Sequence, residues 1–263
     1  MRAVAMQPVQ PMQIKPRLTI VVREDAAFED ATRKHGLCST CQSHDRCLSA
    51  TLHSTSGSPV DDLVTVRRRL RKGDAMYRAG DRFSALYVIR SGSCKTVLLD
   101  EHGQEQIVGY HMAGDIVGID GIGTDHHECE AKMLEDTEVC SLPFEELERL
   151  ARDDEVLQQN VHRLLAREIA RARRLMLLLG TMRAEQRLAV FLLDLSERYL
   201  ARGYSSCEFV LRMTREEIGS YLGLKLETVS RLLSRLVDEG LIRAEGRSIK
   251  LLDRMALRRL LEK

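Results

Sequence analysis

Short apolar stretches bounded by polar turn residues recur between Val64 and about Leu142. The clearest stretches are residues 86–89, 94–99 and 106–110. Glycine-containing turn sequences separate them, at 72–74, 79–81, 91–93, 101–103 and 113–115. Several short strands with a turn every ~8–12 residues are typical of a compact barrel or roll. We therefore expect a β-roll, which we bound at residues 53–152.

The spacing of apolar residues changes over residues 153–180, where they recur mostly at three- and four-residue steps. This spacing predicts one long helix, which at ~1.5 Å per residue is ~40 Å long, more than one small domain needs. It is either a core helix with a solvated arginine face or a dimerisation helix that packs against its own copy. We favour dimerisation, through the apolar residues Leu157, Val161, Leu164, Ala172, Leu175 and Leu179.

A further helix is expected over 184–199, and the segment 213–242 then predicts two short helices. Thr214 and Glu217, three residues apart, form a capping box that begins the first of them. Gly223 breaks the pattern, and the second helix runs from about Lys225 to Asp238. Two short helices joined by a glycine-containing turn form a helix-turn-helix. The hairpin that follows completes a winged helix, with basic residues suited to phosphates at Arg243, Arg247 and Lys250.

Four polar residues stand at the start of the second short helix: Glu227, Thr228, Ser230 and Arg231. In a helix-turn-helix this end of the second helix enters the major groove of DNA. Arginine bonds two acceptors of guanine, and glutamate accepts from cytosine N4. Residues 181–263 also carry 16 Lys and Arg against 12 Asp and Glu, a balance that favours nucleic acid.

The composition, with 44% hydrophobic and 30% charged residues in 263, is ordinary for a soluble protein of two domains. No apolar run approaches the ~18 residues of a membrane span, and residues 1–16 lack a signal-peptide pattern. We therefore expect a cytoplasmic protein, in which thiols are more often metal ligands or reactive groups than disulfides. The sequence shows no nucleotide-binding glycine loop and no nucleophile constellation, so we do not expect an enzyme.

Three of the seven cysteines lie close together as Cys38, Cys41 and Cys47, in a polar loop that we bound at 35–52. A tail over 1–34 precedes them. An iron–sulfur cubane needs four ligands, normally thiolates, and zinc would accept these three thiolates with one imidazole. The spacing C-x2-C-x5-C leaves iron–sulfur, zinc and redox thiols open. A fourth thiolate would come from Cys94, Cys129, Cys140 or Cys207.

These segments together resemble the CRP/FNR family of transcription regulators, and within it the FNR branch, over roughly residues 35–255. Three motifs carry the resemblance. They are the cysteine spacing, the segment LYVIRSG…EQIVGYHMAGDIVGIDGIG with the later VCSLPFEEL, and LGLKLETVSRLL, which matches the E-x-x-S-R recognition helix of the branch.

The resemblance implies an α+β fold with three parts. An N-terminal β-roll, a jelly roll like that of cyclic-nucleotide-binding domains, leads into the dimerisation helix at 153–180, and a winged helix-turn-helix follows at 181–263. The resemblance also implies a [4Fe–4S] cluster held by Cys38, Cys41, Cys47 and Cys140, with Cys129 as the rival fourth ligand. Cys94 and Cys207 are then expected to be apolar fillers. Glu227, Ser230 and Arg231 are implied as base readers.

The resemblance further implies a mechanism. The cluster forms without oxygen and favours a homodimer, which binds palindromic double-stranded DNA with half-sites like TTGAT and serves genes of anaerobic or microaerobic metabolism. Oxygen converts the cluster to [2Fe–2S] and then destroys it. The turn at Gly103 matches a loop that in this family contacts RNA polymerase.

Cyclic nucleotides are not expected as ligands. Binders in the family use an Arg-Ser or Arg-Thr pair after a Gly-Glu, whereas this chain has Gly114-Asp115 and then the sequence HHECE at 126–130. The adjacent His126 and His127 are either metal ligands or polar surface residues, and we favour the surface.

Two alternatives remain beside the iron–sulfur regulator. One is a DNA-binding regulator switched by zinc or by thiol oxidation. The other is an iron–sulfur electron-transfer protein, for which the helix-turn-helix has no use and no second cluster motif is found.

Overall fold

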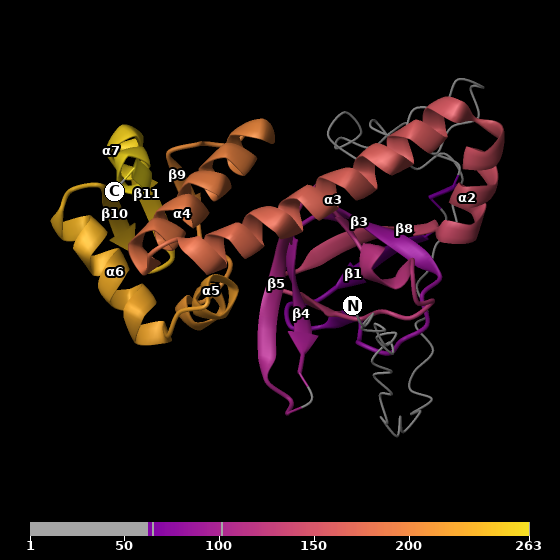
Figure 1. Cartoon of the computed structure of the whole chain (residues 1–263), viewed down its shortest axis with the longest axis horizontal. Coiled ribbons are helices and arrows are strands. Elements are labelled where there is room, and N and C mark those ends of the chain that lie inside the picture. Colours follow the sequence, from indigo (N-terminus) through magenta and orange to yellow (C-terminus); the bar gives the residue numbers. More distant parts are fainter. Residues whose placement is uncertain (1–62, 65, 101, 263) are drawn as a thin grey trace, which may run out of the picture. The chain divides into compact units, whose positions relative to one another are not determined.

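The computed structural model describes residues 63–262 except 65 and 101 (Figure 1). The predicted cysteine loop at 35–52 and the tail at 1–34 lie outside the described residues.

Two four-stranded antiparallel sheets form the β-roll. The first has the order β1 (Val66–Leu70), β8 (Thr137–Pro143), β3 (Ala85–Ser91) and β6 (Ile116–Val117). The second has the order β2 (Ala75–Tyr77), β7 (Glu130–Met133), β4 (Ser93–Leu99) and β5 (Glu105–Met112). The three apolar stretches of the sequence lie in β3, β4 and β5. Apolar residues from both sheets pack together between them, as the alternation of strand side chains requires.

Two helices follow the β-roll: α2 (Phe144–Asp153) and the long α3 (Glu155–Thr181), between which Asp154 turns the chain. The Asp154 carboxylate accepts a hydrogen bond from the Leu157 N–H at 2.9 Å and so caps α3. The first half of α3 packs on the β-roll through Leu157 and Leu164. Its last turns contribute the buried Leu178 to a second apolar cluster.

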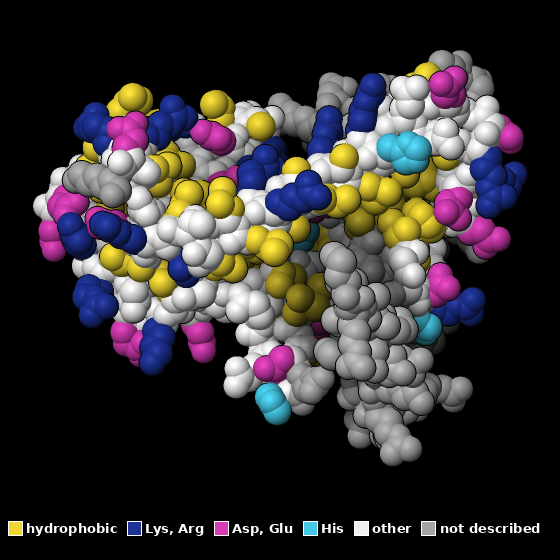
Figure 2. Space-filling model, viewed as in Figure 1, with side chains coloured by type: hydrophobic (Ala, Val, Ile, Leu, Met, Phe, Trp, Pro, Cys, Tyr) yellow, Lys and Arg dark blue, Asp and Glu magenta, His cyan; other side chains and the backbone are white. Residues whose placement is uncertain are grey.

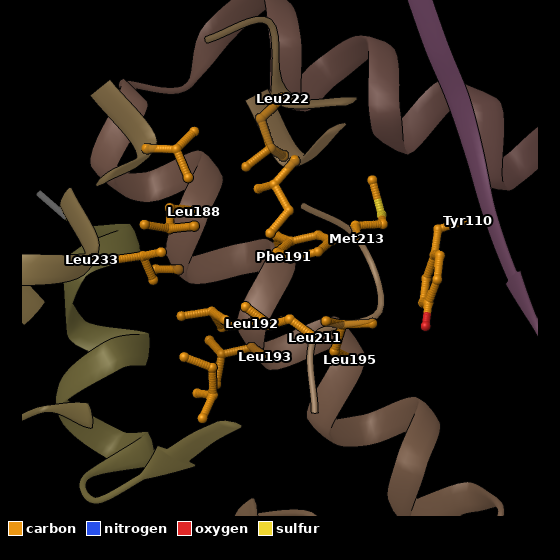
Figure 3. Packing of buried hydrophobic residues seen from close by; sticks show 14 of the residues in the cluster. Tyr110, Leu188, Phe191, Leu192, Leu193, Leu195, Leu211, Met213, Leu222 and Leu233 are labelled. Atoms are coloured by element: carbon orange, nitrogen blue, oxygen red, sulfur yellow. The ribbon is translucent and has the colours of Figure 1, made fainter. Parts of the chain in front are cut away.

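That second cluster is centred on α4 (Ala184–Ala201) and the segment after it. Figure 3 shows Leu188, Phe191 and Leu192 of α4 among residues of the later elements. These elements are β9 (Glu208–Val210), α5 (Arg215–Leu222), α6 (Leu226–Asp238), β10 (Ile242–Glu245), β11 (Ser248–Leu251), α7 (Arg254–Arg259) and the 3-10 turn η4 (Leu260–Glu262). The predicted helix-turn-helix and wing are therefore present. Strand β9, which pairs with β11, was not predicted.

The turn between α5 and α6 depends on two glycines. Gly223 has φ 62°, in the left-handed region that favours glycine, and ends α5. Gly219, one turn earlier, is buried, and a Cβ placed on it would lie 2.5 Å from the Leu224 carbonyl oxygen. Because that oxygen belongs to the backbone, it has no room to move without opening the turn.

We predict that Gly219→Ala lowers the free energy of unfolding by about 1–3 kcal/mol, the usual cost of overpacking a tight site. Gly180→Ala is the matched control, since a Cβ there meets nothing within 4 Å. That change should instead raise the free energy of unfolding by up to about 1 kcal/mol, because alanine favours a helix over glycine. Urea denaturation of both variants measures the difference. Equal effects of the two changes would show that the turn tolerates a side chain.

Candidate functional site

The start of α6 presents a polar surface to solvent. Glu227 and Arg231 are exposed, and Thr228 and Ser230 are half-buried beside them. The opposite face of the helix is buried through Val229, Leu233 and Leu236. Within the described part of the chain, no side-chain hydrogen bond or ion pair joins Glu227 or Arg231 to another residue. Both side chains are therefore exposed to solvent and have no side-chain partner in the described chain.

The neighbouring basic residues differ in this respect. Arg235, one turn further along α6, pairs with Glu239 at 2.8 Å and with Glu185 at 3.4 Å. On the wing, Arg243 is exposed, and Lys250 pairs with Glu208 across β9 and β11 at 3.4 Å. Figure 2 shows several Lys and Arg side chains projecting from the part of the molecule that contains α6. Such side chains suit phosphate contacts around a base-reading centre.

The six residues predicted for dimerisation take three different places. Leu157 and Leu164 are buried in the chain's own β-roll cluster, and Val161 packs against it. Leu175 and Leu179 pack against the cluster around α4. Of the six, Ala172 alone is exposed. The exposed apolar residues of α3 include Ile169 and Met176, at 53% and 72% exposure, which the prediction missed. Figure 2 shows hydrophobic side chains beside arginines along the visible face of α3.

Cys140 is the one described cysteine among the four cluster ligands that the family resemblance implies. It is buried on β8, where it pairs with Arg67 of β1 and Val88 of β3. It packs in one cluster with Leu63 and Val64, the first residues that the structure describes. The chain that carries Cys38, Cys41 and Cys47 therefore joins the fold beside Cys140.

Cys129 directly precedes β7, a strand of the other sheet. Burial, together with the carboxylates of Asp120 and Glu128, raises the pKa of its thiol to about 12. Cys140 is buried to the same degree, at 7% exposure against 8% for Cys129, so burial does not distinguish the two cysteines.

The two remaining described cysteines were both predicted to be apolar fillers. Cys94 is fully buried in the β-roll core, and burial raises the pKa of its thiol. Cys207 is exposed, so the prediction is wrong for this residue. Cys207 lies just before β9, in which Phe209 is buried between the exposed Glu208 and Val210.

Comparison with known proteins identifies the chain. Residues 186–260 match the Crp-like helix-turn-helix domain, and residues 67–154 match the cyclic nucleotide-binding domain. Over 224 residues the chain is 47% identical to the transcriptional regulatory protein btr of Bordetella pertussis, covering 85% of this chain and 93% of that protein. Over 223 residues it is 41% identical to the fumarate and nitrate reduction regulatory protein of Escherichia coli (strain K12), covering 85% and 89%. The chain belongs to the CRP/FNR family.

Within this CRP/FNR family the relatives place the chain in the FNR branch, as the sequence motifs predicted. The solved structure of FixK2 from Bradyrhizobium japonicum is 32% identical and has a TM-score of 0.69, covering 74% of this chain and 96% of that one. The match confirms the predicted order of β-roll, long helix and winged helix-turn-helix. Because the relatives are transcription regulators, the expectation of a regulator rather than an enzyme is confirmed as well.

The loop between β6 and β7 of this CRP/FNR chain contains a buried histidine that sequence reasoning misplaced. His127 is 3% exposed, not at the surface, and its ring stacks on Tyr77 with centroids 3.6 Å apart. The Asp120 carboxylate lies 3.6 Å from the His127 ring and accepts the backbone N–H groups of Glu128 and Cys129 at 2.9 and 3.0 Å. Backbone N–H groups of this kind bind anions, and here the chain's own carboxylate occupies two of them.

The exposed turn at Gly103 is shaped by a single carboxylate. The Asp100 side chain accepts the backbone N–H groups of His102 and Gln104 at 2.8 and 2.7 Å. Gly103 has φ 75°, which closes the turn between β4 and β5.

Among the described helices, none is long and apolar enough to cross a membrane.

Proposed function

We propose that this protein is a cytoplasmic, homodimeric regulator that binds palindromic DNA and senses oxygen through a [4Fe–4S] cluster, controlling anaerobic or microaerobic genes. The observation that carries the DNA-binding part is the unpartnered pair Glu227 and Arg231 at the exposed start of α6. Names of the relatives, such as the fumarate and nitrate reduction regulatory protein, support the metabolic setting. The E-x-x-S-R pattern supports half-sites like TTGAT.

Base reading follows from the geometry of α6. Glu227 and Arg231 are four residues apart and so lie on one face of the helix, with Ser230 and Thr228 beside them. Arg231 has the donor pair that matches guanine O6 and N7, and Glu227 accepts from cytosine N4. Since neither charge is used inside the described chain, binding DNA breaks no internal ion pair at these side chains.

We predict that Arg231→Ala weakens binding to the palindrome by about 1–3 kcal/mol and relaxes the preference at one base pair of each half-site. Arg235→Ala is the control. Arg235 is already engaged by two glutamates, so its removal should leave sequence preference intact. Competition binding with single-base variants of the palindrome measures both proteins. A uniform loss on every duplex with Arg231→Ala would mean that Arg231 contacts phosphate.

The proposed cluster rests on the donor set. Cys140 is buried next to the place where the cysteine-bearing segment joins β1, and the other three thiols lie outside the described residues. Four thiolates are what a cubane requires, and the position of Cys140 suits the fourth. Cys129 fits less well, because it lies outside the segment VCSLPFEEL, which carries the resemblance to the FNR branch. The cluster would be the group that reacts with oxygen, and the buried strand β8 would hold its fourth ligand.

Replacement of the cysteines tests this ligand set. We expect anaerobically purified wild type to be brown and to bleach in air. Cys140→Ser should lose the visible absorption band and anaerobic DNA binding, whereas Cys129→Ser should keep both. Metal analysis of the same samples separates the alternatives. Stoichiometric zinc without iron or sulfide would favour the zinc-switched regulator, and neither metal with reversible thiol oxidation would favour the thiol switch. The opposite behaviour of the two variants would make Cys129 the ligand.

The proposed homodimer uses a row on α3 that neither internal core covers. Leu165, Ile169, Ala172 and Met176 follow one another at steps of four, three and four residues. This is the spacing of a coiled-coil seam, in which each copy inserts its side chains between those of the other. Leu157, Leu164 and Leu178 are already buried within one chain, so the row supplies what a second copy would meet. Ala172 belongs to both the predicted set and this row.

We predict that Ile169→Glu shifts the anaerobic protein from dimer to monomer, because a carboxylate would be buried without a partner in the seam. Leu177→Glu is the matched control, since Leu177 is 57% exposed but lies off the row. It should leave the dimer in place. Sedimentation velocity under argon measures the two proteins. If Leu177→Glu were monomeric and Ile169→Glu remained a dimer, the interface would lie on another face of α3.

The Gly103 turn is proposed as a contact for RNA polymerase. It is exposed and lies between strands β4 and β5, as the matching family loop requires. Cyclic nucleotide remains an unexpected ligand, because the loop before β7 lacks the Arg-Ser pair and holds its own carboxylate at Asp120. The relatives argue against the electron-transfer alternative, because they are transcription regulators.

A further inference from the structure

An ion pair joins the β-roll to the first helix of the helix-turn-helix. The Lys95 ammonium on β4 lies 2.8 Å from a carboxylate oxygen of Glu217 on α5. Both side chains are largely buried, at 11% and 20% exposure. The other Glu217 oxygen accepts the Thr214 N–H at 2.7 Å, so the same carboxylate caps α5 and receives the lysine. Nearby, the Ile107 N–H of β5 donates to the Ser220 hydroxyl at 2.9 Å.

A second attachment lies beyond the other end of β5, at Asp115. Its carboxylate accepts hydrogen bonds from Arg198 on α4 and, at 2.6 Å, from Arg202, which caps the C-terminal end of that helix. Arg202 also donates to the Ala113 carbonyl at 2.6 Å. Burial alone would raise the pKa of Asp115, but the two guanidinium groups outweigh it and hold the pKa below its usual value. The carboxylate is therefore charged at neutral pH and keeps both arginines.

Two separated attachments fix an orientation that one attachment would leave free to pivot. From Ile107 to Met112 the strand extends about 17 Å at ~3.4 Å per residue, which separates the contact on α5 from that on α4. Between them, Ile107, Tyr110 and Met112 belong to the same apolar cluster as the residues of α4. Figure 3 shows Tyr110 at the edge of that cluster. Helix α6 must follow α5, because the turn at Gly219 has no spare room.

We infer that Lys95 is a positioning residue for DNA recognition: by holding Glu217, it sets the angle of α6 relative to α3 and so the half-site spacing that the dimer accepts. This inference rests on the proposed function, because it needs a dimer on a palindrome. In a dimer joined along α3, the separation of the two α6 helices follows from that angle. Paired recognition helices read half-sites at a defined separation along the duplex, so a fixed angle selects one spacing.

The test compares Lys95→Met with Lys132→Met in full-length, anaerobically purified protein. Lys132 is directly opposite Lys95 on β7 and therefore on the same face of the sheet. In the described part of the chain it has no ion pair, so its replacement removes a charge without releasing α5. Glu217→Gln is a second variant, because glutamine preserves the capping box while it removes the charge. Binding is measured on palindromes whose central spacer is lengthened or shortened one base pair at a time.

Wild type and Lys132→Met should prefer one spacer and lose on the order of tenfold in affinity on its neighbours, as for a defect of a single contacted base pair. Lys95→Met and Glu217→Gln should bind the preferred spacer more weakly and lose less than about threefold on its neighbours. Their affinity for a duplex with one half-site should be unchanged, which a general folding defect would not give. In these two variants the Ile107 amide should exchange its hydrogen with solvent faster, and the Val97 amide should exchange at the wild-type rate. This difference would show directly that the contact between β5 and α5 has opened.

An identical spacer profile and identical Ile107 exchange in wild type and Lys95→Met would overturn the inference while leaving the proposed function intact. A wild-type protein that binds no palindrome would overturn the proposed function and this inference with it. If Lys132→Met weakened the dependence of affinity on spacer length as much as Lys95→Met, loss of a positive charge would explain the result. That outcome would overturn the specific role of the ion pair.

Discussion

The carboxylate of Asp115 is the constraint on which the arrangement of the described chain depends. A buried charge is costly unless it is paired and hydrogen-bonded, and here Arg198 of α4 and Arg202 at the end of that helix supply both. Arg171 of α3 donates to the Tyr110 carbonyl, which Arg198 also contacts at 2.9 Å. The β-roll, the long helix and the DNA-binding part are therefore joined at one turn of the chain. Losing either arginine would leave the carboxylate buried with one guanidinium partner and the Met112 N–H.

Local signals in the sequence predicted local structure well. The predicted capping box of Thr214 and Glu217 is present, because both of its hydrogen bonds form within one helical turn. The strand-like stretches lie in β3, β4 and β5 for the same reason, since turn residues and apolar runs act over a few positions. The short strand β9 escaped notice because it gains its partner only from β11, about forty residues later.

The face of α3 that is exposed could not be predicted from periodicity alone. Two stretches of this helix pack against two different clusters, and each produces the three- and four-residue spacing of an amphipathic helix. Leu157 and Leu175 therefore looked alike in the sequence, although they serve different cores. The burial of His127 was missed for a similar reason. Its stacking on Tyr77 joins residues fifty positions apart, and two adjacent histidines gave no hint of it.

The end of α3 affects how the protein can be divided. Arg187 of α4 donates to the carbonyls of Leu179, Met182 and Leu222, at 2.7, 2.9 and 3.0 Å, and so ties three segments together. Leu178 is buried in the same apolar cluster as the helix-turn-helix. A fragment that began at residue 181 would lack this cover and expose part of the apolar interior to water. The end of α3 thus belongs to the packing of the DNA-binding part, and the β-roll and the winged helix-turn-helix share this one helix.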